Sequence, residues 1–212
     1  LRGCSAGSAP SASSLWLLTA DQLGYTPTLT QTPSLEAVTT ASTFVLEQPR
    51  CVFDSYGNAD IWLVVALAKA TSTFNNTARP GTPETAYQLF PGSVSAYMTL
   101  NATLANYPCP KPAGEITVLR VGSETSCAGD EARPTCNGPL PNPGPYRVKF
   151  LALQGSEPVA ETVWSESITL RTAEPPSSIS TTGKGHSAGM IAITTILSIL
   201  FAILLAGLVA ML

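Results

Sequence analysis

The chain is poor in charge. Only 12% of its 212 residues are Asp, Glu, Lys or Arg, about half of the ~25% that is usual for a soluble domain. The 11 basic residues are outnumbered by 14 acidic ones, and the net charge is −3. Because nucleic-acid binding needs clustered Lys and Arg to neutralise phosphates, this balance argues against a nucleic-acid partner.

Histidine is almost absent. The one histidine, His186, lies beside the apolar C-terminus, so a Ser–His–Asp or Cys–His site would have to be built there. The chain has no HExxH motif, no phosphate-binding GxxxxGK motif and no CxxC pair that would suggest zinc. Glu131, Glu157 and Glu161 are predicted to lie in turns or at exposed strand ends. The sequence therefore predicts a protein that is not an enzyme and that binds no cofactor or metal.

Short segments rich in β-branched and aromatic residues predict an all-β ectodomain. Glycine and proline, 16 and 18 of them, separate these segments, and the spacing is typical of an immunoglobulin-like or fibronectin III-like sandwich. Residues 61–67 are apolar throughout, as in a strand buried on both faces. Apolar and polar residues alternate over 146–153, which predicts that Arg147 and Lys149 face water. The predicted strands are residues 42–47, 51–53, 61–67, 97–100, 116–121, 146–153 and 167–172.

The segment before residue 146 resembles a tyrosine corner. Leu140 precedes Tyr146 by six positions, and Tyr146 opens a predicted strand. In sandwiches with this motif, the tyrosine hydroxyl bonds to upstream backbone. The alternative is a proline-rich turn before an ordinary strand. The strand that follows Tyr146 favours the corner, with Leu140 and Tyr146 as its structural residues.

Four cysteines follow the first twenty residues: Cys51, Cys109, Cys127 and Cys136. An even number in an exported domain predicts two disulfides, and four cysteines allow three pairings. A glycine, an aspartate and a proline between Cys127 and Cys136 favour a compact turn there. We therefore expect a Cys127–Cys136 bond, which leaves Cys51–Cys109 as the second.

Two sequons predict N-linked glycans. They begin at Asn75 and at Asn101, and each has a threonine two positions later. The motif also occurs by chance, so an unused asparagine in a turn is the alternative. Asn75 precedes a Pro- and Gly-rich stretch that favours an exposed loop.

Residues 190–212 carry no charge. As a helix they span about 35 Å, enough for a bilayer core of about 30 Å, whereas a buried core helix rarely runs this long without a polar face. We expect a single transmembrane helix over 190–212, a juxtamembrane linker over 176–189 and a lumenal or extracellular β-sandwich over 21–175. This order predicts a single-pass type I membrane protein.

Both ends of the chain leave alternatives open. Residues 1–20 have the composition of a signal-peptide remnant. The Lys or Arg that usually follows a span does not follow residues 190–212. Either a cytoplasmic tail is missing, or the C-terminus is a signal for a glycolipid anchor, with residues 180–182 as its small-residue site.

The apolar segment has one row of small residues. In a helix they recur every four positions and form a slowly drifting stripe: Thr194, Ser198, Ala202, Ala206 and Ala210. Small residues allow two helices to approach closely in lipid. We therefore expect this stripe to be the face that contacts a partner helix, although small residues are common in membrane helices and chance is the alternative.

A set of segments closely resembles the uroplakin III family, and within it the IIIb and IIIb-like members. The segments that carry the resemblance are residues 46–54, 62–66, 119–122, 136–137, 139–140, 144–150, 160–165 and 189–191. The resemblance covers roughly residues 25–205, in order. The family's cytoplasmic tail does not follow in this chain, and residues 68–96 have no firm match, so Asn75 is not supported by the resemblance.

The resemblance implies a structural membrane glycoprotein. Such a protein would pair with the tetraspanin uroplakin Ib in a higher-order plaque with other uroplakins. These plaques, the asymmetric unit membrane, lie in the apical plasma membrane of urothelium and support a permeability barrier. The alternatives are a fibronectin-like adhesion or cytokine-type receptor, or a glycolipid-anchored surface protein.

Overall fold

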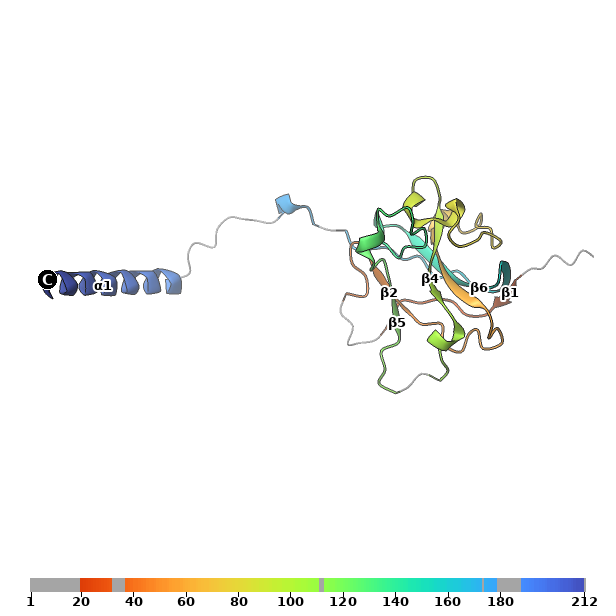
Figure 1. The fold of residues 1–212 in the computed structure, drawn as a ribbon, viewed down its shortest axis with the longest axis horizontal. Coiled ribbons are helices and arrows are strands. Elements are labelled where there is room, and N and C mark those ends of the chain that lie inside the picture. The colour runs from red at the N-terminus through yellow and green to blue at the C-terminus, as the bar shows by residue number, and fades with distance from the viewer. Residues whose placement is uncertain (1–19, 32–36, 111–112, 173, 179–187, 212) are drawn as a thin grey trace, which may run out of the picture. The chain divides into compact units, whose positions relative to one another are not determined.

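The structure, a computed structural model of the whole chain, describes residues 20–31, 37–110, 113–172, 174–178 and 188–211. The chain divides into two units, residues 1–172 and residues 173–212. The first unit contains the β-strands, and we name it the ectodomain after the position that the sequence predicts for it; the second contains the helix α1, Ala188–Met211 (Figure 1).

The ectodomain is built from two β-sheets. The larger sheet has the strand order β1-β7-β6-β3-β4, and the smaller is the antiparallel pair β2-β5. All neighbours in the larger sheet are antiparallel except β1 and β7, which are parallel. The strands are β1 Asp21–Leu23, β2 Phe44–Glu47, β3 Asp60–Leu67, β4 Ala96–Ala102, β5 Val118–Val121, β6 Tyr146–Gln154 and β7 Glu157–Thr162.

Short 3-10 helices occupy the connections. In the ectodomain they are η1 Ala68–Ala70, η2 Pro83–Thr85, η3 Tyr87–Leu89, η4 Leu104–Asn106 and η5 Thr125–Cys127. A sixth, η6 Pro176–Ser178, belongs to the second unit. The all-β class predicted for the ectodomain, with one apolar C-terminal helix, is therefore confirmed.

The main core joins the two sheets. Phe44 and Leu46 of β2 and Val121 of β5 belong to the same buried cluster as Leu63 of β3 and Phe150 of β6. Each sheet therefore buries one of its faces against the other sheet. This burial is the main stabilising term available to the ectodomain, at about 25 cal/mol for each Å² of apolar surface removed from water.

The other face of the large sheet is also covered. Val64, Met98 and Leu151 form a second buried cluster, against which Phe74 and Trp164 pack. Strand β3 is consequently buried on both faces, as its uninterrupted apolar sequence predicts. The segment between β3 and β4, which contains Phe74, supplies part of this cover.

This cover makes one sequence prediction wrong, because Lys149 does not face water. Its side chain is 5% exposed, and its ammonium pairs with the carboxylate of Glu161. It also donates to Asn76 Oδ1 at 2.6 Å and lies 5.3 Å and 4.9 Å from the ring centroids of Phe74 and Trp164. Burial lowers the pKa of Lys149 below its usual value, and the hydrogen bond that its ammonium donates to Glu161 acts in the opposite direction.

The prediction for Glu161 is wrong for the same reason. Glu161 lies inside β7, and its side chain is 19% exposed beside the lysine. Alternation along β6 marks its two faces correctly. It does not reveal that a loop from elsewhere in the chain covers the second face.

Five predicted strands are confirmed, as β2 to β6, and two are wrong. Residues 51–53 form a turn in which Cys51 has φ +61°. Within 167–172, Ile168 makes only an isolated bridge to Tyr146. The sequence analysis does not predict strands β1 and β7. Strand β7 follows a two-residue turn and contains Pro158, and a proline argues against a central strand.

The buried ion pair yields the first prediction. Lys149→Ala leaves the Glu161 carboxylate partly buried without a cation and should lower the free energy of unfolding by about 3 kcal/mol. Replacing both partners with apolar residues of similar size, Lys149→Met with Glu161→Leu, should restore most of the loss. Denaturant unfolding of the protein in detergent, followed by tryptophan fluorescence, measures both. A Lys149→Ala variant as stable as the parent would show that the pair stabilises nothing.

Candidate functional site

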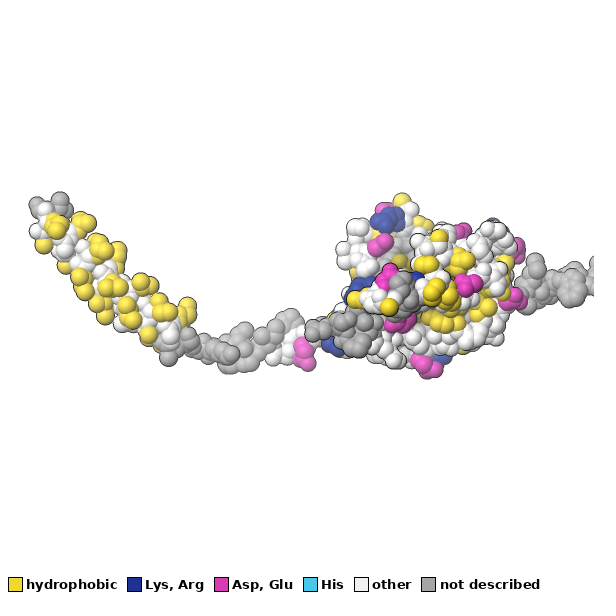
Figure 2. All heavy atoms as spheres, turned by 90° about the horizontal axis from the view of Figure 1, so that it is seen from below, with side chains coloured by type: hydrophobic (Ala, Val, Ile, Leu, Met, Phe, Trp, Pro, Cys, Tyr) yellow, Lys and Arg dark blue, Asp and Glu magenta, His cyan; other side chains and the backbone are white. Residues whose placement is uncertain are grey.

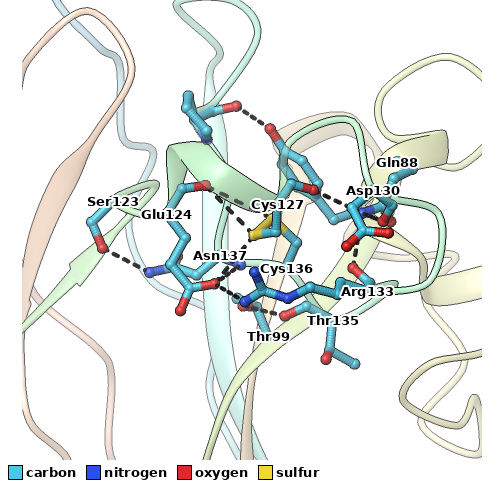
Figure 3. Close-up of a disulfide and its surroundings, with 12 residues drawn as sticks. Gln88, Thr99, Ser123, Glu124, Cys127, Asp130, Arg133, Thr135, Cys136 and Asn137 are labelled. Carbon is cyan, nitrogen blue, oxygen red and sulfur yellow. Dashed lines mark hydrogen bonds and ion pairs between the residues drawn. A yellow bond between two sulfur atoms is a disulfide. The ribbon is translucent and has the colours of Figure 1, made fainter.

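A disulfide-closed loop, residues 123–137, follows β5 and is held by one disulfide and several hydrogen bonds (Figure 3). Cys127 and Cys136 are joined, with their Cα atoms 5.8 Å apart. Three successive turns lie between them, closed by bonds from Asp130 N to Cys127 O, Arg133 N to Asp130 O and Cys136 N to Arg133 O at 3.0–3.1 Å. The compact turn expected from the sequence is therefore present, with the favoured pairing.

Asn137 attaches this loop to β5. Its Oδ1 accepts from Gly122 N at 2.8 Å, and its Nδ2 donates to Arg120 O at 3.0 Å. The side-chain amide of Asn137 thus makes the hydrogen bonds at the end of β5 that a neighbouring strand would otherwise make. Gly122 has φ +90°, and an added Cβ would meet Ser42 O, so glycine is required there.

Gln88 attaches the other side of the loop to η3. Its Nε2 approaches the carbonyl oxygens of Cys127, Asp130 and Arg133 at 3.3, 2.7 and 2.8 Å (Figure 3). Beside it, Tyr87 N donates to Pro134 O at 2.8 Å. These bonds hold the loop and the η2–η3 segment as one rigid surface.

A groove lies between these two segments. Its volume is about 350 Å³, and it is lined by Gly81, Pro83, Ala86, Gln88, Leu89, Glu131 and Pro134. Leu89 is 40% exposed there. The loop's cation is already engaged, since Arg133 Nη2 lies 3.2 Å from Glu124 Oε2. We call this pocket, lined by the seven residues from Gly81 to Pro134 given above, the η3 groove.

The second disulfide joins Cys51 to Cys109, with Cα atoms 5.0 Å apart, and both residues are exposed. Each disulfide has an acidic residue, Asp54 or Glu124, within 4.8 Å of its sulfur atoms. Because all four sulfur atoms are in disulfides, neither of these groups offers the thiolate that a metal would need.

Tyr146 makes the hydrogen bond that a tyrosine corner requires. Its Oη donates to Asn142 O, four residues upstream, at 2.7 Å. Tyr146 and Leu140 are both buried in the main core. Pro143 O accepts from Leu170 N at 2.9 Å, which ties the corner to the last part of the ectodomain.

Both sequon asparagines are exposed. Asn75 Oδ1 accepts from Thr77 N at 3.0 Å and from Thr77 Oγ1 at 2.8 Å. Asn101 lies on the edge strand β4, next to a register shift opposite β3. The predicted glycans at Asn75 and Asn101 stay predictions.

The helix α1 contains a segment, Gly189–Met211, that is long and apolar enough to cross a membrane. No charged side chain is visible on it, whereas the ectodomain face carries several (Figure 2). The hydroxyls of Thr194 and Ser198 donate to Met190 O and Thr194 O at 2.9 and 2.8 Å, within their own helix. The predicted small-residue face is not tested by these bonds.

Several predictions lie outside the described residues: the signal-peptide remnant, the small-residue site at 180–182 and His186. The sequence also contains two G-x-S-x-G pentapeptides, at 3–7 and 185–189. That motif is catalytic at a strand-to-helix turn of an α/β sheet. The sheets of the described ectodomain are connected by turns, loops and single-turn 3-10 helices.

Fold and site together define a membrane protein with a disulfide-stabilised β ectodomain and one apolar spanning helix among the described residues. No protein-family model matches the chain. It is 40% identical over 182 residues to uroplakin-3b-like protein 1 of Bos taurus, covering 84% of this chain and 69% of that protein. The chain belongs to the uroplakin III family, as the resemblance predicted.

Two further relatives support this assignment. Uroplakin-3b-like protein 1 of Homo sapiens is 40% identical over 190 residues, covering 85% of this chain and 65% of that protein. Uroplakin-3a of Homo sapiens is more distant, at 30% identity over 204 residues, covering 82% of this chain and 71% of that protein. The chain thus spans roughly two thirds of the length of these relatives.

The corner yields a second prediction. Tyr146→Phe removes the bond to Asn142 O and should lower the free energy of unfolding by about 1–2 kcal/mol. Tyr56→Phe is the matched control, because the Tyr56 Oη bond to Asp21 at 2.8 Å is exposed and should contribute much less. Urea titrations of both variants measure the difference, and equal midpoints would contradict a structural role for the Tyr146 hydroxyl.

A third prediction concerns the disulfides. Cys127 and Cys136 are buried, whereas Cys51 and Cys109 are exposed, and a thiolate must reach a sulfur atom to exchange with it. Limited reduction should therefore open Cys51–Cys109 first. Alkylation of the freed thiols followed by peptide mass spectrometry identifies them. Recovery of a peptide linking Cys51 to Cys127 would refute both pairings.

Proposed function

We propose that the chain is a structural, non-enzymatic membrane glycoprotein that pairs with a tetraspanin of the uroplakin Ib type. The pair would assemble with other uroplakins into the plaques of the asymmetric unit membrane, in the apical membrane of urothelium, and support its permeability barrier. The observation that carries this proposal is the 40% identity to uroplakin-3b-like proteins over 84% of the chain. In this proposal the chain is type I, with the β domain lumenal or extracellular.

The ectodomain has the features expected of a passive structural part. We assign it to the immunoglobulin-like or fibronectin III-like sandwiches, because two sheets share one core and Tyr146 bonds to upstream backbone. Two disulfides constrain its unfolded state, which suits a domain exposed outside the cell. Glycans at Asn75 and Asn101 would lie on exposed positions of this domain.

The helix supplies a second route to a lateral partner. The small side chains of Thr194, Ser198, Ala202, Ala206 and Ala210 recur every four residues along α1. A bulky row, Ile196, Leu200, Leu204 and Leu208, lies about 160° away by helical geometry. In lipid, close backbone approach drives helix association because apolarity alone does not. We assign the small-residue face to the partner helix and the bulky row to lipid.

The fourth prediction tests the pairing. The full chain is co-expressed with the tetraspanin uroplakin Ib in epithelial cells and purified in mild detergent, and the tetraspanin should co-purify in stoichiometric amount. Ala202→Leu with Ala206→Leu should remove most of it, because the added side chains separate the helices. The control, Leu200→Ala with Leu204→Ala, should retain it.

The outcomes separate the two parts of the proposal. Absence of the tetraspanin from the parent purification would refute the pairing itself. Equal recovery with both double variants would refute the helix face and leave the ectodomain as the contact.

A further inference from the structure

We propose that the segment in which the chain leaves the β domain is a modification site. Its hydroxyls, those of Thr172, Ser177 and Ser178, carry O-linked N-acetylgalactosamine. The proposal rests on the lumenal or extracellular position that the proposed function gives to the β domain, because this sugar is added in the secretory pathway. Two features of the chain carry it: the composition of the segment and the accessibility of its hydroxyls.

The segment is rich in serine, threonine and proline. Residues 172–182 read TAEPPSSISTT, in which six of the eleven residues are Ser or Thr, two are Pro and one, Glu174, is charged. No aromatic residue occurs in this stretch of the sequence. Such a composition buries too little apolar surface to form a core. Serine- and threonine-rich stretches that contain proline are typical of stalks with O-linked glycans.

The structure shows where the β domain stops holding the chain. Leu170 N donates to Pro143 O at 2.9 Å, and Arg171 N donates to Thr40 O at 3.0 Å. Thr172, the next residue, is exposed. The second unit of the chain begins directly after it, at residue 173. The segment therefore leaves the domain at Thr172.

Residues 174–178 form a local turn with accessible hydroxyls. Ser178 N and Ser178 Oγ both donate to Pro175 O, at 2.9 and 2.7 Å, around the single-turn helix η6. Ser177 and Ser178 are both exposed. A transferase can therefore reach these oxygens without opening a sheet or a core.

Buried hydroxyls of the β domain are used differently. Thr162 Oγ1 accepts from Phe150 N at 2.9 Å, and Ser165 Oγ accepts from Val148 N at 3.0 Å. Thr162 and Ser165 are buried. Their oxygens complete the hydrogen bonding of β6 and are closed to an enzyme. The contrast identifies the hydroxyls after Arg171 as acceptors.

The reaction is the transfer of one sugar from UDP-N-acetylgalactosamine. The serine or threonine oxygen forms a bond to the anomeric carbon, and the bond from that carbon to the phosphate oxygen breaks. UDP leaves with the electron pair, and the hydroxyl proton is released. Exposed segments of small polar residues are preferred sites of proteolysis. A glycan on Thr172 lies beside the Arg171–Thr172 peptide bond and shields it.

The test uses the full chain, expressed in epithelial cells that lack UDP-glucose 4-epimerase and are fed galactose. These cells make UDP-N-acetylgalactosamine only when N-acetylgalactosamine is also supplied. The chain is purified from plasma membranes and digested with trypsin, which yields a peptide that ends at Lys184. Mass spectrometry with electron-transfer fragmentation should locate an N-acetylhexosamine on Thr172, Ser177 or Ser178. Without the supplied sugar, this modification should be lost.

Two triple variants isolate the site. Thr172→Ala with Ser177→Ala and Ser178→Ala should remove the sugar located at these positions. The control is Ser55→Ala with Thr125→Ala and Ser126→Ala. It removes one threonine and two serine hydroxyls that are also exposed but have no proline within three positions. The control should keep the modification of the parent chain.

The outcomes distinguish this proposal from the proposed function. An antibody against the β domain is applied to intact cells. If it does not bind, the proposed topology fails, and the O-glycan proposal fails with it. If it binds and the peptide is unmodified, or is modified only at 180–182, the O-glycan proposal alone is refuted. A modification that persists without N-acetylgalactosamine, as a mannose would, refutes it as well.

Discussion

The antiparallel ladder between β3 and β6 is the constraint on which the rest of the ectodomain depends. Eight consecutive pairs, from Asp60–Leu153 to Leu67–Tyr146, place these strands at the centre of the larger sheet. Since both faces of this pair are covered, a one-residue slip would exchange the side chains of the two buried clusters. The ladder thereby fixes Tyr146 at the corner and Lys149 on the covered outer face.

The groove depends on this sheet through its edge. Strand β4 pairs with β3, and the η2–η3 segment and the disulfide-closed loop both contact β4 or its neighbours. A rigid scaffold thus presents a loop surface, the usual place for recognition in a β domain.

Much of the framework could be predicted from local pattern. The strands corresponding to β2 to β6 follow from β-branched and apolar runs, and the turn residues between Cys127 and Cys136 favoured the observed bond. The groove could not be predicted, because Gln88 and Pro134 are brought together by the return of the chain across β4. The same is true of Asn137, whose role beside β5 has no local signature.

The sequence by itself determined a β domain with two disulfides and an apolar helix long enough to span a membrane. These properties depend on composition, periodicity and spacing, which are local. The place in the uroplakin III family came instead from the resemblance of ordered segments to known members, which the relatives confirm. Only the tertiary structure decided that Lys149 is buried between Phe74 and Trp164, and that a groove lined by Leu89 and Pro134 lies beside the disulfide-closed loop. The burial of Lys149 and the position of the groove depend on which distant segments pack against a strand. Such long-range packing leaves no periodic pattern of apolar and polar residues in the sequence.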